Sequence, residues 1–289
     1  MYKTSIYPGI LVLILVFSGC KLFDGDDEGE QLEAEWSFTG IEQLTISTVS
    51  GDCMVQPADD DTLRVDVSYT FPESCFEPRY SHVGSALELQ EVFSGVACNG
   101  SSHWVITIPD GIDIEFSSAS GNLTMTDHQG GLDASTASGE ISLDNVDGAI
   151  EASTASGKVD VSQAVGELQL SSASGDVDCE GVAITAASSF SSASGDVSVV
   201  VAESPSHDVS VSSASGRAVM NYNGNPVTGT FVFTARQDLG TIVSPYTFDS
   251  ETTFTQVDVI YDLKTFIRGG ATPSITIATA SGTAELRLN

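Results

Sequence analysis

The chain has 289 residues, with 40 acidic side chains against 10 lysines and arginines, and a formal net charge of −30. Between Tyr80 and Ser215 the only lysine or arginine is Lys158. Because a nucleic-acid partner requires many cations to neutralise its phosphates, the composition excludes nucleic acid as a natural partner.

The segment 1–19 has the layout of a lipoprotein signal peptide. Lys3 precedes an apolar run over residues 10–17, and "FSGC" then ends at Cys20. The run is shorter than the roughly 20 residues that a membrane-spanning helix needs. Small residues directly before a cysteine resemble the bacterial lipobox, so we expect lipidation of Cys20 and a lipid-anchored position in the cell envelope, at the outer membrane or the cell surface. The alternative is an ordinary cleaved signal in which Cys20 is incidental.

Residues 20–35 form an acidic segment with few apolar side chains, which is typical of a solvated, flexible tether. Two acidic stretches, "DGDDEGE" at 24–30 and "ADDD" at 58–61, could bind calcium loosely. Neither matches the spaced ligand loop of a tight calcium site, so we expect no metal site and no cofactor. The remaining residues, 36–289, are predicted to form one folded domain.

Residues from about 57 to 102 depart from the compact pattern of their neighbours and are predicted to be an insertion. This segment contains Cys75 and Cys98. In an exported protein the pair is a candidate disulfide, and a loop of this size contributes about 3 kcal/mol. Cys53 and Cys179 fall at apolar positions of the repeats described next, so we expect them to be buried thiols.

The central part of the chain repeats a short motif, "SSASG" or "STASG", at a nearly fixed spacing. Its closing glycines recur first at a constant interval and then at two slightly longer ones: Gly121, Gly139, Gly157, Gly175, Gly195 and Gly216. Around them, apolar residues alternate with polar ones at the period of a strand. Three apolar columns result, headed by Phe116, Leu123 and Met125, with weaker copies near Ile46 and Ile277.

A unit of this length cannot bury an apolar face alone, but a stack of such units can. The sequence therefore predicts an all-β fold, a single-stranded parallel β-helix or solenoid with about 18–21 residues per coil. The glycines would be coil corners, where a backbone angle is required that other residues resist. Ala155 would be packed tightly at its corner, and the residues after the glycines would form an outward column in which Lys158 lies between Glu140 and Asp176.

Catalysis finds little support in the sequence. The four histidines, His82, His103, His128 and His207, have no metal-binding spacing, and "SSASG" is not the Gly-x-Ser-x-Gly nucleophile motif. Polysaccharide lyases built on solenoids depend on basic side chains, which the middle coils lack. We therefore expect a protein that is not an enzyme.

Two stretches carry a family resemblance: "WVITIPDGIDIEFSSASGNLTM", followed by the repeated coils, and "GGATPSITIATASGTAELRL" near the end. They resemble the bacterial "putative adhesin" domains of unknown function, similar to head-type adhesin domains of exported lipoproteins, over about residues 36–289. The resemblance implies a right-handed coil and an envelope or surface location. It supplies no catalytic residues.

Three functions are compatible with these features. The first is an envelope-anchored, adhesin-like module that binds a glycan or an envelope or extracellular protein. The second is a structural scaffold without a ligand of its own. The third is an ice- or surface-binding solenoid, suggested by a ladder of hydroxyl residues at Ser118, Thr136, Thr154, Ser172, Ser192 and Ser213.

Overall fold

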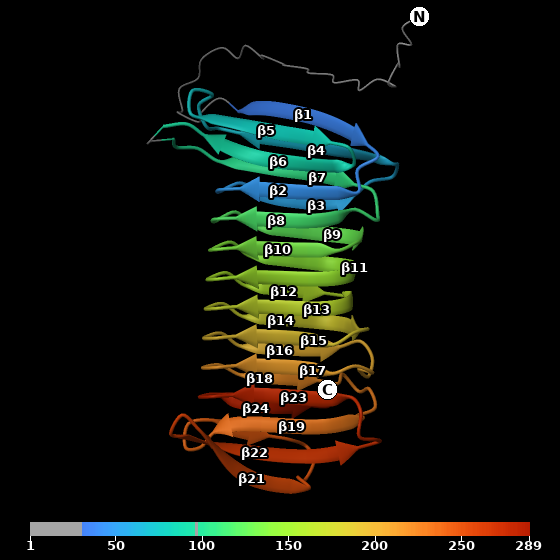
Figure 1. Cartoon of the computed structure of the whole chain (residues 1–289), viewed down its shortest axis with the longest axis vertical. Coiled ribbons are helices and arrows are strands. Elements are labelled where there is room, and N and C mark those ends of the chain that lie inside the picture. The colour runs from blue at the N-terminus through green and yellow to red at the C-terminus, as the bar shows by residue number, and fades with distance from the viewer. Residues whose placement is uncertain (1–30, 96–97) are drawn as a thin grey trace, which may run out of the picture.

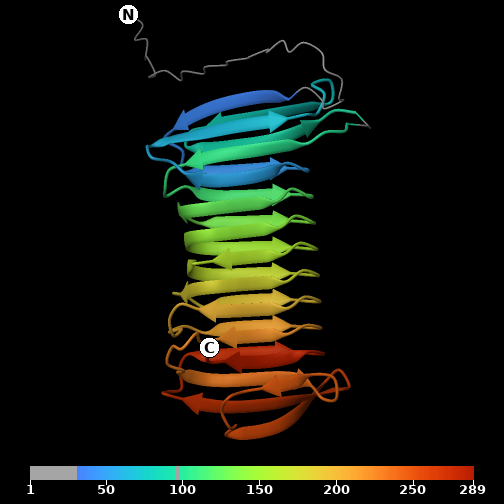
Figure 2. The same cartoon turned by 180° about the vertical axis from the view of Figure 1, so that it is seen from behind.

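The computed structural model describes residues 31–95 and 98–289, and every regular element in these ranges is a β-strand. The strands are stacked into one elongated column (Figures 1 and 2). None of the described residues belongs to a helix with the length and apolar character that a bilayer span requires.

Each central coil contributes one strand to each of two facing sheets. The first sheet contains β8 (Asp113–Ser118), β10 (Leu132–Thr136), the end of β11 (Ile141–Thr154), β13 (Val165–Ser172), β15 (Ser188–Ser192) and β17 (Val209–Ser213). The second sheet contains β9 (Leu123–Gln129), the start of β11, β12 (Val159–Ser162), β14 (Val177–Ile184), β16 (Val197–Val201) and β18 (Ala218–Asn221). The structure is therefore all-β and solenoid-like.

The strands of successive coils pair in parallel and in the register that the glycine spacing predicts. Ala134, for example, pairs with Phe116 on one side and with Ala152 on the other. The columns headed by Phe116, Leu123 and Met125 point between the two sheets, and none of their members from Phe116 to Met220 is more than 2% exposed. The predicted inward columns are confirmed, and they form one continuous apolar core.

The N-terminal end is closed by the predicted insertion. β2 (Gln43–Thr48) pairs with β8 on one side and with β6 (Ala86–Phe93) on the other, and β5 (Phe76–Val83) lies antiparallel beyond β6. In the second sheet β3 (Asp52–Pro57) pairs with β9 and β7 (Ser102–Ile108), followed by β4 (Thr62–Tyr69) and β1 (Leu32–Thr39). β1 begins at Leu32, so residues 32–35 lie in a strand and not in the tether predicted over 20–35.

The C-terminal end is closed in a similar way. β19 (Gly229–Arg236), β20 (Thr241–Val243), β21 (Ser250–Gln256) and β22 (Val259–Arg268) form a cap, in which β19, β22 and β21 pair antiparallel. The last two strands, β23 (Ser274–Thr279) and β24 (Thr283–Arg287), lie between this cap and the coils. β23 pairs in parallel with both β17 and β19, and β24 with both β18 and β20.

The cysteines divide into two kinds. Cys75 and Cys98 form a disulfide within the N-terminal insertion, with their Cα atoms 5.8 Å apart. Cys53 and Cys179 are free and buried among the apolar columns, and this burial raises the pKa of both thiols above the usual range. Both therefore stay as neutral thiols that act as small apolar side chains.

Candidate functional site

The hydroxyl ladder lies inside the corners. The Thr154 hydroxyl donates to the carbonyl of Gly139 in the preceding coil (3.1 Å) and accepts from the N–H of Gly157 in its own coil (2.9 Å). Similar pairs of hydrogen bonds recur at Thr136, Ser172, Ser192 and Ser213. These five residues are at most 7% exposed. These hydrogen bonds join each coil to the next. Because the hydroxyls are buried, they do not form the outward surface that the ice-binding alternative requires.

The corner glycines are required by the close approach of neighbouring coils. A Cβ atom added to Gly157 would lie 1.8 Å from the carbonyl oxygen of Gly139, and the corresponding distances at Gly139 and Gly175 are 2.0 and 1.8 Å. None of the six predicted corner glycines has a left-handed φ. The glycines lie at the corners as predicted, but the predicted reason is wrong, because the constraint is steric and not conformational.

A second glycine column was missed. Gly130, Gly148 and Gly166 recur at the same interval as the first corner glycines and stack at the opposite edge of the coils. A Cβ on Gly166 would meet the carbonyl oxygen of Gly148 at 1.7 Å. The spacing was visible in the sequence, but these glycines are not preceded by a repeated motif. The column ends at Gly166, because the next coil is longer and pairs Ile184 with Gly166.

At the N-terminal end, Glu91 supplies the hydrogen-bond acceptors that the preceding coil supplies at the other corners. Its Oε2 accepts the N–H groups of Val49, Ser50 and Gly51 at 2.7, 3.1 and 3.3 Å. Its Oε1 accepts the indole N–H of Trp104 at 3.2 Å and the hydroxyl of Ser102. Glu91 is only 8% exposed. This buried carboxylate therefore satisfies the donors of the first corner in the stack.

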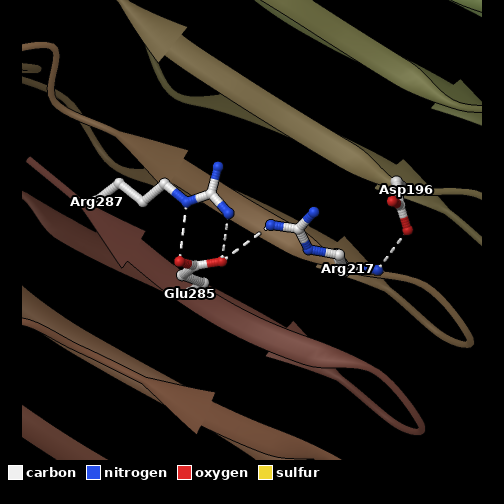
Figure 3. A network of polar contacts seen from close by, with 4 residues as sticks. All are labelled: Asp196, Arg217, Glu285 and Arg287. Carbon is white, nitrogen blue, oxygen red and sulfur yellow. Dashed lines mark hydrogen bonds and ion pairs between the residues drawn. The ribbon is translucent and has the colours of Figure 1, made fainter. Parts of the chain in front are cut away.

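The residues after the corner glycines form the predicted outward column. The carboxylate of Asp196 accepts the backbone N–H of Arg217 in the next coil at 2.8 Å (Figure 3). Asp52, Asn122 and Asp176 accept from their successors in the same way. Arg217 also donates to Glu285 at 3.1 Å, beside two bonds from Arg287 to that carboxylate (Figure 3). The bonds from Arg287, followed by that from Arg217, lower the pKa of Glu285.

Lys158 does not bridge the carboxylates predicted for it. Its Nζ lies 2.7 Å from Asp160 and 3.0 Å from Asp178, whereas Glu140 and Asp176 were expected. The stacking register is as predicted, but the side chain leans along its strand toward the residue two positions on, which lies on the same face. The hydrogen bond to Asp160, and then that to Asp178, raise the pKa of Lys158.

The outer surface of the first sheet carries a shallow groove of about 810 Å³, which we call the serine face. Ser153, Ser171, Ser191 and Ser212 pair in register along its floor. Beside them lie the corner alanines, of which Ala155, Ala173, Ala193 and Ala214 line the groove and are exposed. The prediction that Ala155 is tightly packed is therefore wrong. Thr234 of β19 and Tyr261 of β22 border the groove at the C-terminal cap.

The other candidate residues do not assemble into a site. Among the residues that the structure describes, no three metal-ligating side chains come together. Within the acidic stretch at 58–61, Asp60 forms an ion pair with Arg64 at 2.6 Å. His128 is buried, with Nε2 2.9 Å from the carbonyl of Ile112, and desolvation lowers its pKa. Cys20, the signal segment and the stretch at 24–30 lie outside the described residues.

Two solved structures resemble the chain. One is a "putative cell adhesion protein" from Clostridium sporogenes, with 14% identity, 90% of this chain and 100% of that chain covered, and a TM-score of 0.28. The other is a "putative adhesin" from Bacteroides fragilis, with 11% identity, 90% and 97% coverage, and a TM-score of 0.48. No curated protein matches the sequence.

The family model described as Toastrack DUF4097 matches residues 41–228, which include the whole N-terminal insertion and all the central coils. This match confirms the resemblance to a domain family of unknown function that was drawn from the corner motifs. Because the match covers more than half of the chain, the protein belongs to the Toastrack DUF4097 family.

Proposed function

We propose that the protein is a non-catalytic, envelope-anchored lipoprotein that acts as an adhesin-like binding module, with the serine face as its contact surface. The observation that carries this proposal is the groove across successive coils, whose floor is made only of small side chains. Small side chains leave the sheet surface open to close approach, and hydroxyls recur about every 4.8 Å along the stack. Such a surface suits an extended partner, a glycan or a protein segment.

Acidic side chains beside the serine face limit the classes of partner that can bind there. Glu115, Asp133 and Glu151 lie side by side in three neighbouring strands of the first sheet, one pleat from the serines. Like charges in register repel one another and also repel an anionic ligand. We therefore propose a neutral glycan or a neutral to basic protein segment as the partner. The right-handed sense of the coil belongs to the same proposal.

The face is tested by converting Ser153, Ser171 and Ser191 together to lysine. These side chains are half-exposed, so the thermal midpoint should change little, while adhesion of the purified protein to cells or arrayed glycans should fall at least tenfold. The matched control places lysines at Thr124, Ser142 and Ser198 on the outer surface of the second sheet. Equal loss in both variants, or none in either, would contradict the assignment of the face. A wild-type protein that binds neither cells nor glycans nor envelope proteins would favour the scaffold alternative.

The anchor is tested separately at Cys20. Replacing Cys20 with serine removes the sulfur atom that the lipobox-type reaction modifies, so the protein should move from the membrane fraction to the soluble fraction. The measurement is partition of the full chain between the detergent and aqueous phases. The matched control is Cys53→Ser, which should leave membrane partition unchanged. Unaltered partition of the Cys20→Ser protein would refute lipid anchoring at this residue.

A further inference from the structure

The outermost strand at the C-terminal end of the column, β21, has a free edge (Figures 1 and 2). Among the described residues it pairs with β22 alone. All its residues, Ser250–Gln256, are exposed. The edge that faces away from β22 therefore presents a row of backbone N–H and C=O groups to solvent, and such a row is the template on which a further strand can add.

The hydrogen bonds of the cap identify the residues that turn their backbone groups to this edge. The N–H of Gln237, just after β19, donates to the carbonyl of Ile260 at 2.9 Å. Backbone direction alternates along a strand, so Tyr261 turns its N–H and C=O toward β21, where its partner is Phe254. By the same alternation, three residues of β21 turn theirs to the free edge: Glu251, Thr253 and Thr255.

The edge strands at the N-terminal end carry features that hinder strand addition, whereas β21 does not. β5 contains Pro78, which has no N–H to donate, between the charged residues Glu77 and Arg79. β1 carries the exposed side chains of Glu33 and Glu35. Proline and charge are the usual means by which an edge strand is protected from pairing with another chain. The sequence of β21, SETTFTQ, has no proline and one charge, and its threonines and phenylalanine favour strands.

The charge of β21 allows a second copy of the chain to approach there. At a net charge of −30, two copies repel each other over most of their surface. On β21 the one charged residue, Glu251, is compensated by Lys264, whose Nζ lies 2.8 Å from the carboxylate. Arg236 and Arg268 add positive charge to the same cap. Two acidic molecules can therefore meet at this edge without bringing uncompensated like charges together.

Two copies of β21 are complementary to each other when they pair antiparallel over their full length. Thr253 then meets the partner's Thr253 at the centre, and Glu251 meets the partner's Thr255, so the residues that turn their backbone groups outward are bonded to one another. Phe254, which is 37% exposed and stacks on Tyr261 with ring centroids 5.3 Å apart, then lies opposite the partner's Thr252. Pairs of an aromatic and a β-branched side chain stabilise a sheet.

We propose that the protein forms a two-fold symmetric dimer by antiparallel pairing of β21 with the partner's β21. The caps of the two copies then share one continuous sheet, and the N-terminal strands lie at the two far ends of the doubled column. One pair of short strands is a small interface, so the dimer forms in a concentration-dependent way. With the anchor proposed at Cys20 on each copy, the dimer would join two membranes; this consequence rests on the proposed function, whereas the dimer does not.

The first test is sedimentation velocity over a concentration series. The protein is the chain from residue 20 onward with Cys20→Ser, which contains every residue that the structure describes and cannot be lipidated. We expect its weight-average mass to rise with concentration toward that of a dimer. Thr253→Pro removes an N–H of the free edge but none that is donated to β22, so this variant should melt like the parent and stay monomeric.

Thr253→Ala is the matched control, since it changes the same side chain but keeps the N–H, and it should dimerise like the parent. A Thr253→Pro variant that dimerises as strongly as Thr253→Ala would overturn the proposal. So would a parent protein that is monomeric at every concentration, which would leave the edge to a strand of a different protein.

Cross-linking tests the register of the pair. In the proposed dimer the Cα atoms of the two Thr253 residues lie about 5.5 Å apart, within the range that a disulfide spans. Thr253→Cys should therefore give a covalent dimer on mild oxidation, seen on a non-reducing gel. In the described residues the native cysteines are either buried or already joined to each other, so they do not compete.

Thr255→Cys is the control for cross-linking. It lies on the same exposed strand with the same backbone direction, but the two copies of Thr255 would be about 14 Å apart, too far for a disulfide. This variant should remain a monomer on the same gel. Equal cross-linking of the two variants, or none with Thr253→Cys, would show that the strands do not pair as proposed.

Discussion

Replacing Gly157 with alanine should destabilise the protein by about 3 to 5 kcal/mol, although it adds a single methyl group. The added Cβ would lie 1.8 Å from the carbonyl oxygen of Gly139, and that backbone is itself held in the stack. To make room, the coils must separate and lengthen the two hydrogen bonds of the Thr154 hydroxyl. The measurement is the free energy of unfolding from a denaturant titration followed by circular dichroism.

The control for this prediction is Ala155→Val, two positions earlier at the same corner. Ala155 is exposed, so the larger side chain points to solvent and should cost no more than about 0.5 kcal/mol. If Gly157→Ala were as stable as Ala155→Val, the coils could not approach each other as closely as the structure shows.

Replacing Glu91 with alanine should cost a similar amount, about 3 to 5 kcal/mol, for a different reason. The substitution leaves the N–H groups of Val49, Ser50 and Gly51 without their acceptor in a partly to fully buried position. It also frees the indole of Trp104, so the change should be seen both in the unfolding free energy and in the tryptophan emission of the folded protein. The unfolding free energy of Glu91→Gln should lie between those of the wild type and of Glu91→Ala, because one carboxylate oxygen is replaced by a donor.

Glu88→Ala is the matched control for Glu91. Glu88 lies on the same strand but on its half-exposed face, where it accepts a hydrogen bond from Gln90. Its loss should change the unfolding free energy by about 0.5 kcal/mol or less. A Glu91→Ala protein no less stable than Glu88→Ala would show that the carboxylate does not support the first corner.

The central coils could be predicted because each coil buries its apolar side chains and turns its corner in the same way. Every unit must bury the same two or three positions and turn at the same corner, so the pattern from Phe116 to Met220 is written several times in the sequence. One copy of the pattern would not determine the period, whereas six aligned copies determine both the period and which side chains point inward. The same argument placed the post-glycine column, although not the partners of Lys158.

The ends of the column could not be predicted in this way. The pairs β1–β4 and β19–β22 are antiparallel and occur once each, so no repetition marks their register. Glu91 is one acid among 40 acidic residues, and nothing near it in the sequence indicates that it is buried. Trp36 of β1 and Tyr80 of β5 come into contact only after the insertion has folded.

The position of β23 and β24 between β17–β18 and the C-terminal cap has a consequence for synthesis of the chain. The cap leaves the ribosome before the strands on which it rests, so it cannot dock in its final place until the segment 269–289 has been made. Until then, β17 and β18 are open edges to which another nascent chain could add. Synthesis of residues 269–289 is thus the step that seals the column, and ribosome stalling within them would be more harmful to assembly than stalling within the repeated coils.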